Sequence, residues 1–179
     1  MFRYLVVCSV VLFVLGGGAA GSTSVVSAQF EGWKTYYNPD LNLAIDYPSY
    51  SESSRPHTNI TETKDEVKIQ MYNLLATINI DSNLQTDLQE YAVFMQQYML
   101  KTLERKLVHS VETVLYNGEL GYRFTLYDPS DKLYTEVIYL HNPSDIDKHY
   151  RTMFVGTNPV GGPPFGQIDE IMNTIRFFD

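Results

Sequence analysis

Apolar and polar positions alternate most clearly between Trp33 and Pro48. Two short apolar runs are separated there by Asn38-Pro39-Asp40, residue types that favour a tight turn. In the second run, large apolar residues alternate with small or polar ones, so that one face of a strand can be buried. The segment therefore predicts a β-hairpin around which the rest of the domain is organised.

The pattern disappears between residues 49 and 66, where Ser, Thr and charged residues dominate. This composition predicts a surface loop. The loop contains Asn59-Ile60-Thr61, a glycosylation sequon that is accessible if the chain is exported, although a chance tripeptide is the alternative. Two strand-like runs follow, at residues 67–72 and 76–80, close enough in sequence to pair.

A helix is predicted after Thr86, because Gln89 stands three residues later in the reciprocal capping pattern. Lys101, Arg105 and Lys106 place positive charge near its C-terminal end, where the helix dipole favours it. Apolar residues recur at three- and four-residue steps, which predicts one core-facing stripe. The stripe consists of Leu88, Tyr91, Ala92, Met95, Tyr98, Met99 and Leu103.

The second half of the chain predicts an antiparallel meander followed by a short helix. Its turns are short, and Asn117-Gly118 is a strong hairpin signal. The run at 133–141 is apolar on both faces, which favours a sheet covered on both sides by helices. The predicted strands are 107–116, 121–127, 133–141 and 150–156, and the closing helix contains 168–175. The predicted fold class is α+β, an α-β-α sandwich with a central antiparallel sheet covered by helices on both faces.

Residues 1–28 differ in kind from the rest of the chain. They carry one charge, an apolar run from Leu5 to Leu15, and small residues before Gln29. This is the pattern of a secretory signal peptide, with an uncleaved N-terminal anchor as the alternative. The predicted organisation is a signal peptide at 1–28, a short linker at 29–32 and a single domain at 33–179. The predicted location is secreted or extracytoplasmic, without a transmembrane span after cleavage.

Removal of the signal peptide takes away one of 13 Lys and Arg residues, none of the 21 Asp and Glu residues, and the sole cysteine, so the mature net charge is −9. An acidic chain is a poor ligand for nucleic acid and for anionic lipid. The sequence also lacks a Gly-x-Ser-x-Gly elbow and a phosphate-binding loop. We therefore predict no enzyme activity, no catalytic residues and no bound organic cofactor.

One constellation can be read as a metal site. His141, Asp145, Asp147 and His149 lie at the end of two predicted neighbouring strands and in the loop between them. Two imidazoles and two carboxylates can bind zinc or another divalent ion. The alternative is a solvated loop whose acidic residues set the turn geometry.

Several strings, taken in order, resemble those of the PsbP-like domain family. They are Trp33, Tyr36, Asn38-Pro39, LAIDYP from Leu43, the long helix, GYRFTLY from Gly121, and the closing run from Ile171 to Phe177. The family includes the extrinsic luminal protein of photosystem II and many exported prokaryotic proteins. A Trp that often follows the Tyr-Pro in the family is replaced by a polar loop after Pro48.

The resemblance implies a helix-covered antiparallel sheet and a non-enzymatic role in binding or assembly, at the cell surface or outside the membrane. The expected partner is a protein or a small ligand. A divalent-metal-binding protein using residues 141–149 is the main alternative, and an extrinsic photosystem II-type assembly factor or an enzyme on this scaffold are further ones. The photosynthetic role is not favoured, because neither a plant-type transit peptide nor an extended N-terminal docking arm is visible.

Overall fold

The computed structural model describes residues 32–48, 58–71, 73–82, 87–141, 143, 148–157 and 162–178. The predicted signal peptide lies outside the described residues, so the domain boundaries stay a prediction. The helices are α1 (Leu88–Thr102) and α2 (Phe165–Met172). The strands are β1 (Trp33–Asn38), β2 (Leu43–Pro48), β3 (Asn59–Glu62), β4 (Glu66–Gln70), β5 (Leu74–Ser82), β6 (Lys106–Tyr116), β7 (Glu119–Asp128), β8 (Leu133–His141), β9 (Lys148–Gly156) and β10 (Arg176–Phe177).

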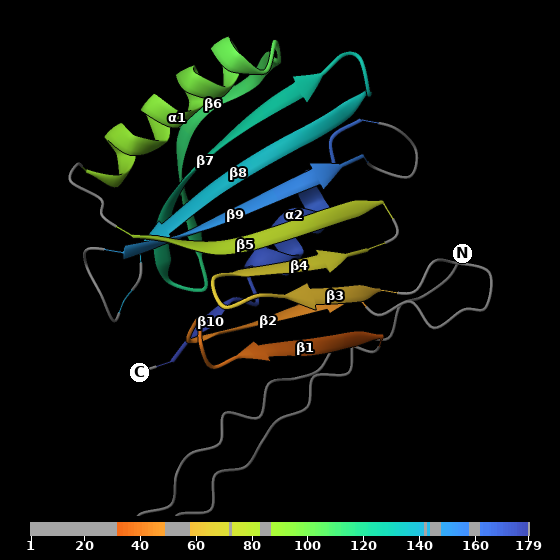
Figure 1. Ribbon diagram of the computed structural model, residues 1–179, viewed down its shortest axis with the longest axis vertical. Coiled ribbons are helices and arrows are strands. Elements are labelled where there is room, and N and C mark those ends of the chain that lie inside the picture. The colour runs from red at the N-terminus through yellow and green to blue at the C-terminus, as the bar shows by residue number, and fades with distance from the viewer. Residues whose placement is uncertain are drawn as a thin grey trace, which may run out of the picture.

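The strands form two antiparallel sheets (Figure 1). The smaller sheet has the order β1-β2-β10, and the larger has the order β3-β4-β5-β9-β8-β7-β6. The predicted meander is present as β6 to β9, each strand pairing with the next. Neither described helix is long and apolar enough to span a membrane.

The predicted hairpin is confirmed as β1 and β2, with Trp33 opposite Pro48. Asn38 fixes its turn, because its side-chain oxygen accepts the Leu41 N–H at 2.9 Å while its amide donates to the Tyr36 hydroxyl at 2.7 Å. Tyr36 in turn donates to Glu62 on β3 and so links the small sheet to the large one. Burial and this bond raise the pKa of Tyr36 to about 12.

Both faces of the large sheet are buried, and neighbouring residues of β8 point to opposite ones. Val137 and Tyr139 lie in the cluster under α1, whereas Ile138 and Leu140 belong to the larger core shared with α2 and the small sheet. Figure 1 shows α1 beside β6 to β8 and α2 behind the sheet.

The predicted α-β-α sandwich is wrong. The described chain is mostly strand, with ten strands and two helices, and much of the second face is covered by the β1-β2-β10 sheet rather than by helix. The physical reason is that an apolar run on both faces of a strand shows that each face is buried, but carries no information about what buries it.

Helix α1 begins one residue after Asp87, whose carboxylate accepts the backbone N–H groups of Gln89 and Glu90. Its predicted stripe is right in part: Leu88 and Ala92 are buried, whereas Tyr98 and Leu103 are exposed. Gln96 is buried instead, since its side-chain oxygen accepts the Val111 N–H at 2.9 Å. A polar residue can therefore take a core position where an edge strand offers a backbone donor.

The predicted loop at 49–66 is wrong over its second part. Asn59–Glu62 forms β3, the outer strand beside β4, with Asn59 opposite Gln70. Only one residue of β3 is partly buried and the other three are exposed. A strand in this position does not need alternating apolar residues, so the sequence carries no pattern that would have indicated it. Asn59 itself is exposed. Glycosylation of the sequon stays a prediction.

Candidate functional site

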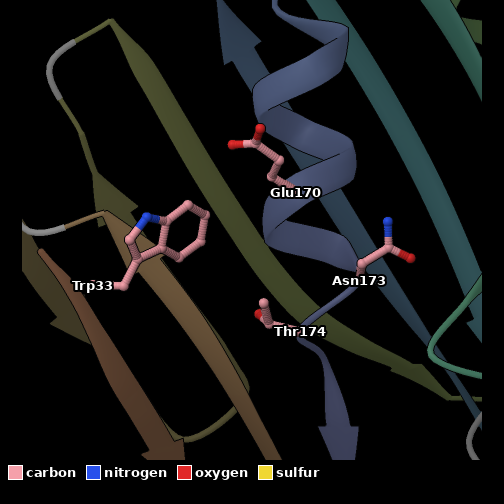
Figure 2. Close-up of a pocket in the computed structure, with 4 residues that line it drawn as sticks. All are labelled: Trp33, Glu170, Asn173 and Thr174. Atoms are coloured by element: carbon pink, nitrogen blue, oxygen red, sulfur yellow. The ribbon is translucent and has the colours of Figure 1, made fainter. Parts of the chain in front are cut away.

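A cavity of about 460 Å³ opens between the first strand of the small sheet and the C-terminal end of α2. Its described lining residues are Trp33, Glu170, Asn173 and Thr174. Figure 2 shows the Trp33 indole and the Glu170 carboxylate extending into the space between β1 and α2, whereas the Asn173 amide points away from Trp33. We call this cavity the Trp33 pocket.

The walls of the Trp33 pocket are held by bonds between chain segments far apart in sequence. The Thr174 hydroxyl accepts the Asp46 N–H at 2.8 Å and donates to the Ile171 carbonyl at 2.7 Å. The Asp46 carboxylate binds Arg176 at 2.8 Å and accepts from the Thr35 hydroxyl at 2.7 Å. The end of α2 is thereby tied to β2, so the pocket is formed before any ligand arrives.

Glu170 is the ionisable group of the pocket. It is exposed, and its carboxylate makes no hydrogen bond or ion pair with another described residue. Trp33 is half-buried and is the single tryptophan of the chain. The pocket therefore combines a large aromatic surface with one negative charge and carries no described cationic side chain.

A second polar cluster lies on the same side of the large sheet, around Arg123. The Arg123 guanidinium donates to Glu112 at 2.6 Å and to Asp169 of α2 at 2.8 Å, and lies 3.6 Å from Glu136. Tyr116 donates to the same Asp169 carboxylate at 2.7 Å. We call these five residues the Arg123 network.

Glu136 is the buried member of the Arg123 network, with 1% of its surface exposed. Burial raises its pKa to about 7, although Arg123 opposes the shift. Burial, followed by the bond to Asp169, also raises the pKa of Tyr116. The bonds of these groups join α2 to β6, β7 and β8. The network is thus accounted for as a structural tie between α2 and the sheet.

The predicted metal ligands are placed only in part. His141 and His149 are opposite each other across β8 and β9. His141 is exposed, but His149 is buried, with its ring 5.1 Å from that of Tyr91 and 5.5 Å from that of Tyr139. Asp145 and Asp147 lie outside the described residues, and within the described ones no group of three or more metal-binding side chains occurs. The metal site stays a prediction.

Sequence reasoning missed the Trp33 pocket. It identified Trp33 as a hairpin residue and assigned Glu170 to the last helix, without connecting them. The two positions are more than 130 residues apart and become neighbours only because β10 returns to pair with β2. The available signal was local and weak: a single tryptophan at the start of a strand.

The two sheets and two helices together make a PsbP-like fold. The solution structure of cyanobacterial PsbP (CyanoP) from Synechocystis sp. PCC 6803 matches with a TM-score of 0.51 and 9% identity, covering 89% of this chain and 99% of that one. The resemblance inferred from sequence is thereby confirmed as a likeness of fold. A crystal structure from Bacteroides thetaiotaomicron matches with a TM-score of 0.42 and 12% identity, covering 82% of this chain and 48% of that one. No protein-family model and no curated protein matches the sequence.

Proposed function

We propose that this chain is an exported, non-catalytic accessory module that binds a ligand or a protein partner outside the membrane through the Trp33 pocket. The observation that carries the proposal is the pocket itself: a preformed cavity of about 460 Å³ lined by an indole, a carboxylate, an amide and a hydroxyl. Cavities of this size with few polar groups are the usual form of small-molecule sites.

The chemistry of the pocket supports binding rather than catalysis. General acid–base work uses groups with matched pKa values within hydrogen-bonding reach of the reacting atoms. Here Glu170 stands as the one ionisable side chain among the described lining residues, and the Thr174 hydroxyl is engaged with backbone groups. The PsbP-like fold supports the same proposal, since the resemblance implies a binding or assembly role.

Site-specific photo-crosslinking tests this function. Asn173, an exposed residue on the pocket wall, is replaced by benzoylphenylalanine in the producing cells, and the exposed Gln97 on α1 is replaced in a matched control. We expect recovery from the extracytoplasmic fraction and an adduct, read as a change in intact mass, at position 173 but not at 97. Equal labelling at both positions, no adduct at 173, or retention in the cytoplasm would contradict the proposal.

A divalent-metal site at the end of β8 and β9 is the second candidate, favoured by the register that sets His141 opposite His149. A metal that binds only the folded state raises the melting temperature by several degrees at a hundredfold excess over its dissociation constant. We expect such a shift from one of calcium, manganese, zinc or copper, reversed by chelator and lost in His141→Ala. Replacement of the exposed His141 leaves the packing of the buried His149 intact, so an unchanged shift in this variant would exclude the site.

A further inference from the structure

We propose that the proton on the buried Glu136 carboxyl group controls how firmly α2 is held against the large sheet. While Glu136 is protonated, Arg123 binds Asp169 of α2. When the proton leaves, Glu136 competes for the same guanidinium nitrogen, and α2 opens more often. The inference does not rest on the proposed function, because it concerns the attachment of a helix and not a ligand.

A single nitrogen of Arg123 faces both Glu136 and α2. This nitrogen, Nη1, lies 2.8 Å from the Asp169 carboxylate, 3.2 Å from the Tyr116 hydroxyl and 3.6 Å from Glu136 Oε1. A terminal guanidinium nitrogen carries two hydrogens, and the two shorter contacts use both of them. Glu136 Oε1 is accordingly buried without a hydrogen-bond partner among the described residues.

Ionisation of Glu136 disturbs this arrangement. With 1% of its surface exposed, the residue is shielded from water, and a buried anion that lacks hydrogen bonds is costly. Nη1 of Arg123 can serve the anion by turning away from Asp169, or from Tyr116, which itself donates to Asp169 at 2.7 Å. Either change weakens the group of bonds that joins Asp169 to the sheet.

The charges around Glu136 act in the same direction. Arg123 of β7 contacts Glu112 of β6, Asp169 of α2 and Glu136 itself, so an ionised Glu136 is the third carboxylate beside one guanidinium. Burial raises the pKa of Glu136 to about 7; Arg123 opposes the shift, whereas Asp169 and Glu112 add to it. The proton is therefore held in the folded protein below about pH 7 and is lost above it.

Helix α2 is short enough to depend on such bonds. It has eight residues, and none of the described side chains caps its N-terminus, so the helix would be marginal on its own. Besides its buried apolar side chains, Asp169 and Phe165 attach it to the large sheet, and the Phe165 ring lies 5.0 Å from that of the ionisable His109 on β6. Because Glu170 follows Asp169 directly, opening of α2 also displaces one wall of the Trp33 pocket.

Hydrogen exchange measured by mass spectrometry tests the proposal on the purified protein. Peptides covering α2 are followed at pH 6 and pH 8, with rates corrected for the intrinsic effect of pH, and peptides covering the central strand β8 report unfolding of the whole domain. We expect α2 to be less protected than β8 and its protection to fall about tenfold from pH 6 to pH 8. This is the fall that follows when opening returns the pKa of Glu136 from about 7 to 4.5.

Matched variants identify the proton that is responsible. Glu136→Gln keeps the shape of the side chain and cannot ionise, so α2 should be equally protected at both pH values. Glu112→Gln removes another carboxylate from Arg123, and His109→Gln removes the ionisable group beside Phe165; both should keep most of the tenfold fall. Asp169→Ala removes the bond from the side of the helix, and should leave α2 at pH 6 no better protected than wild-type α2 at pH 8.

Several results would overturn the proposal. They are an unchanged protection of α2 between the two pH values, a fall that survives in Glu136→Gln, and a fall that is abolished by His109→Gln. Exchange of α2 only together with β8 would also overturn it, because Glu136 would then act on the unfolding of the whole domain. If Glu136→Gln does not fold, Asp169→Ala decides, since unchanged protection of α2 at pH 6 would show that Asp169 does not hold the helix.

Discussion

The two faces of the seven-stranded sheet are both buried, but they are built differently. Under α1 lies a small cluster of six described buried apolar residues, two each from α1, β7 and β8. The opposite face carries twenty buried residues drawn from both sheets and from α2, together with the Arg123 network and the Trp33 pocket. One face is a helix packed on a sheet, whereas the other joins two sheets and a helix.

This difference teaches where function can be placed in such a fold. A single amphipathic helix packs directly on its face, with mainly apolar side chains and a few buried polar ones, such as Gln96 and His149, between helix and sheet. A junction of three elements leaves gaps between them. These gaps are either filled by polar side chains that form hydrogen bonds and ion pairs across the junction, or they stay open as cavities. The face shared by α2 and the small sheet has both: the ties are Arg123, Glu136 and Asp169, and the open gap is the Trp33 pocket.

The largest expected effect comes from removing one leucine from each face. Leu140 belongs to the larger core and Leu126 to the cluster under α1, and both are fully buried. We expect Leu140→Ala to cost about 4–5 kcal/mol and Leu126→Ala about 2–3 kcal/mol, because a site enclosed by two sheets collapses less readily than one under a single helix. Urea unfolding measures both values, and equal costs would show that the two faces are equally rigid.

Breaking the Arg123 network should have the next largest effect. Arg123→Met leaves the buried Glu136 carboxylate without its cation, at a cost of about 3–4 kcal/mol at pH 8. The cost should be much smaller at pH 5, where Glu136 can take up a proton. The exposed pair between Lys68 and Glu66 provides the control, since Lys68→Met should cost less than about 1 kcal/mol at either pH. An equal cost of Arg123→Met at both pH values would contradict this account of Glu136.

Glu136 should also make its own contribution to the dependence of stability on pH. Its pKa is raised from 4.5 to about 7 in the folded state, so between these values the folded protein keeps a proton that the unfolded chain has lost. The stabilisation is therefore complete below pH 4.5 and is lost as the pH rises through 7, a change of about 3 kcal/mol. The difference in unfolding free energy between the wild type and Glu136→Gln isolates this contribution. A difference that stays constant from pH 4.5 to 8 would contradict the raised pKa.

The two faces also differ in how far the sequence predicts them. The three- and four-residue periodicity of α1 and the turn at Asn117-Gly118 are local signals, and they indicated the helix, the hairpin and the meander correctly. The covering of the face that packs on α2 and the small sheet depends on the pairing of β10 with β2. This pairing involves two residues near the end of the chain, too few to produce a periodic pattern in the sequence. The Trp33 pocket and the Arg123 network depend on the same tertiary neighbours, so neither could be found from spacing along the chain.

The smallest expected effect lies on the outer side of α1. Phe94 is 62% exposed and stacks on Tyr98, with ring centroids 6.3 Å apart. Since these rings stay largely in contact with water, Phe94→Ser should change the unfolding free energy by less than about 0.5 kcal/mol. Urea unfolding measures this change, and Leu126→Ala, a buried position on the same face, is measured in parallel for comparison. A cost above about 1.5 kcal/mol would mean that the outer side of α1 is also covered, and the contrast between a single-layer face and a three-element junction would no longer hold.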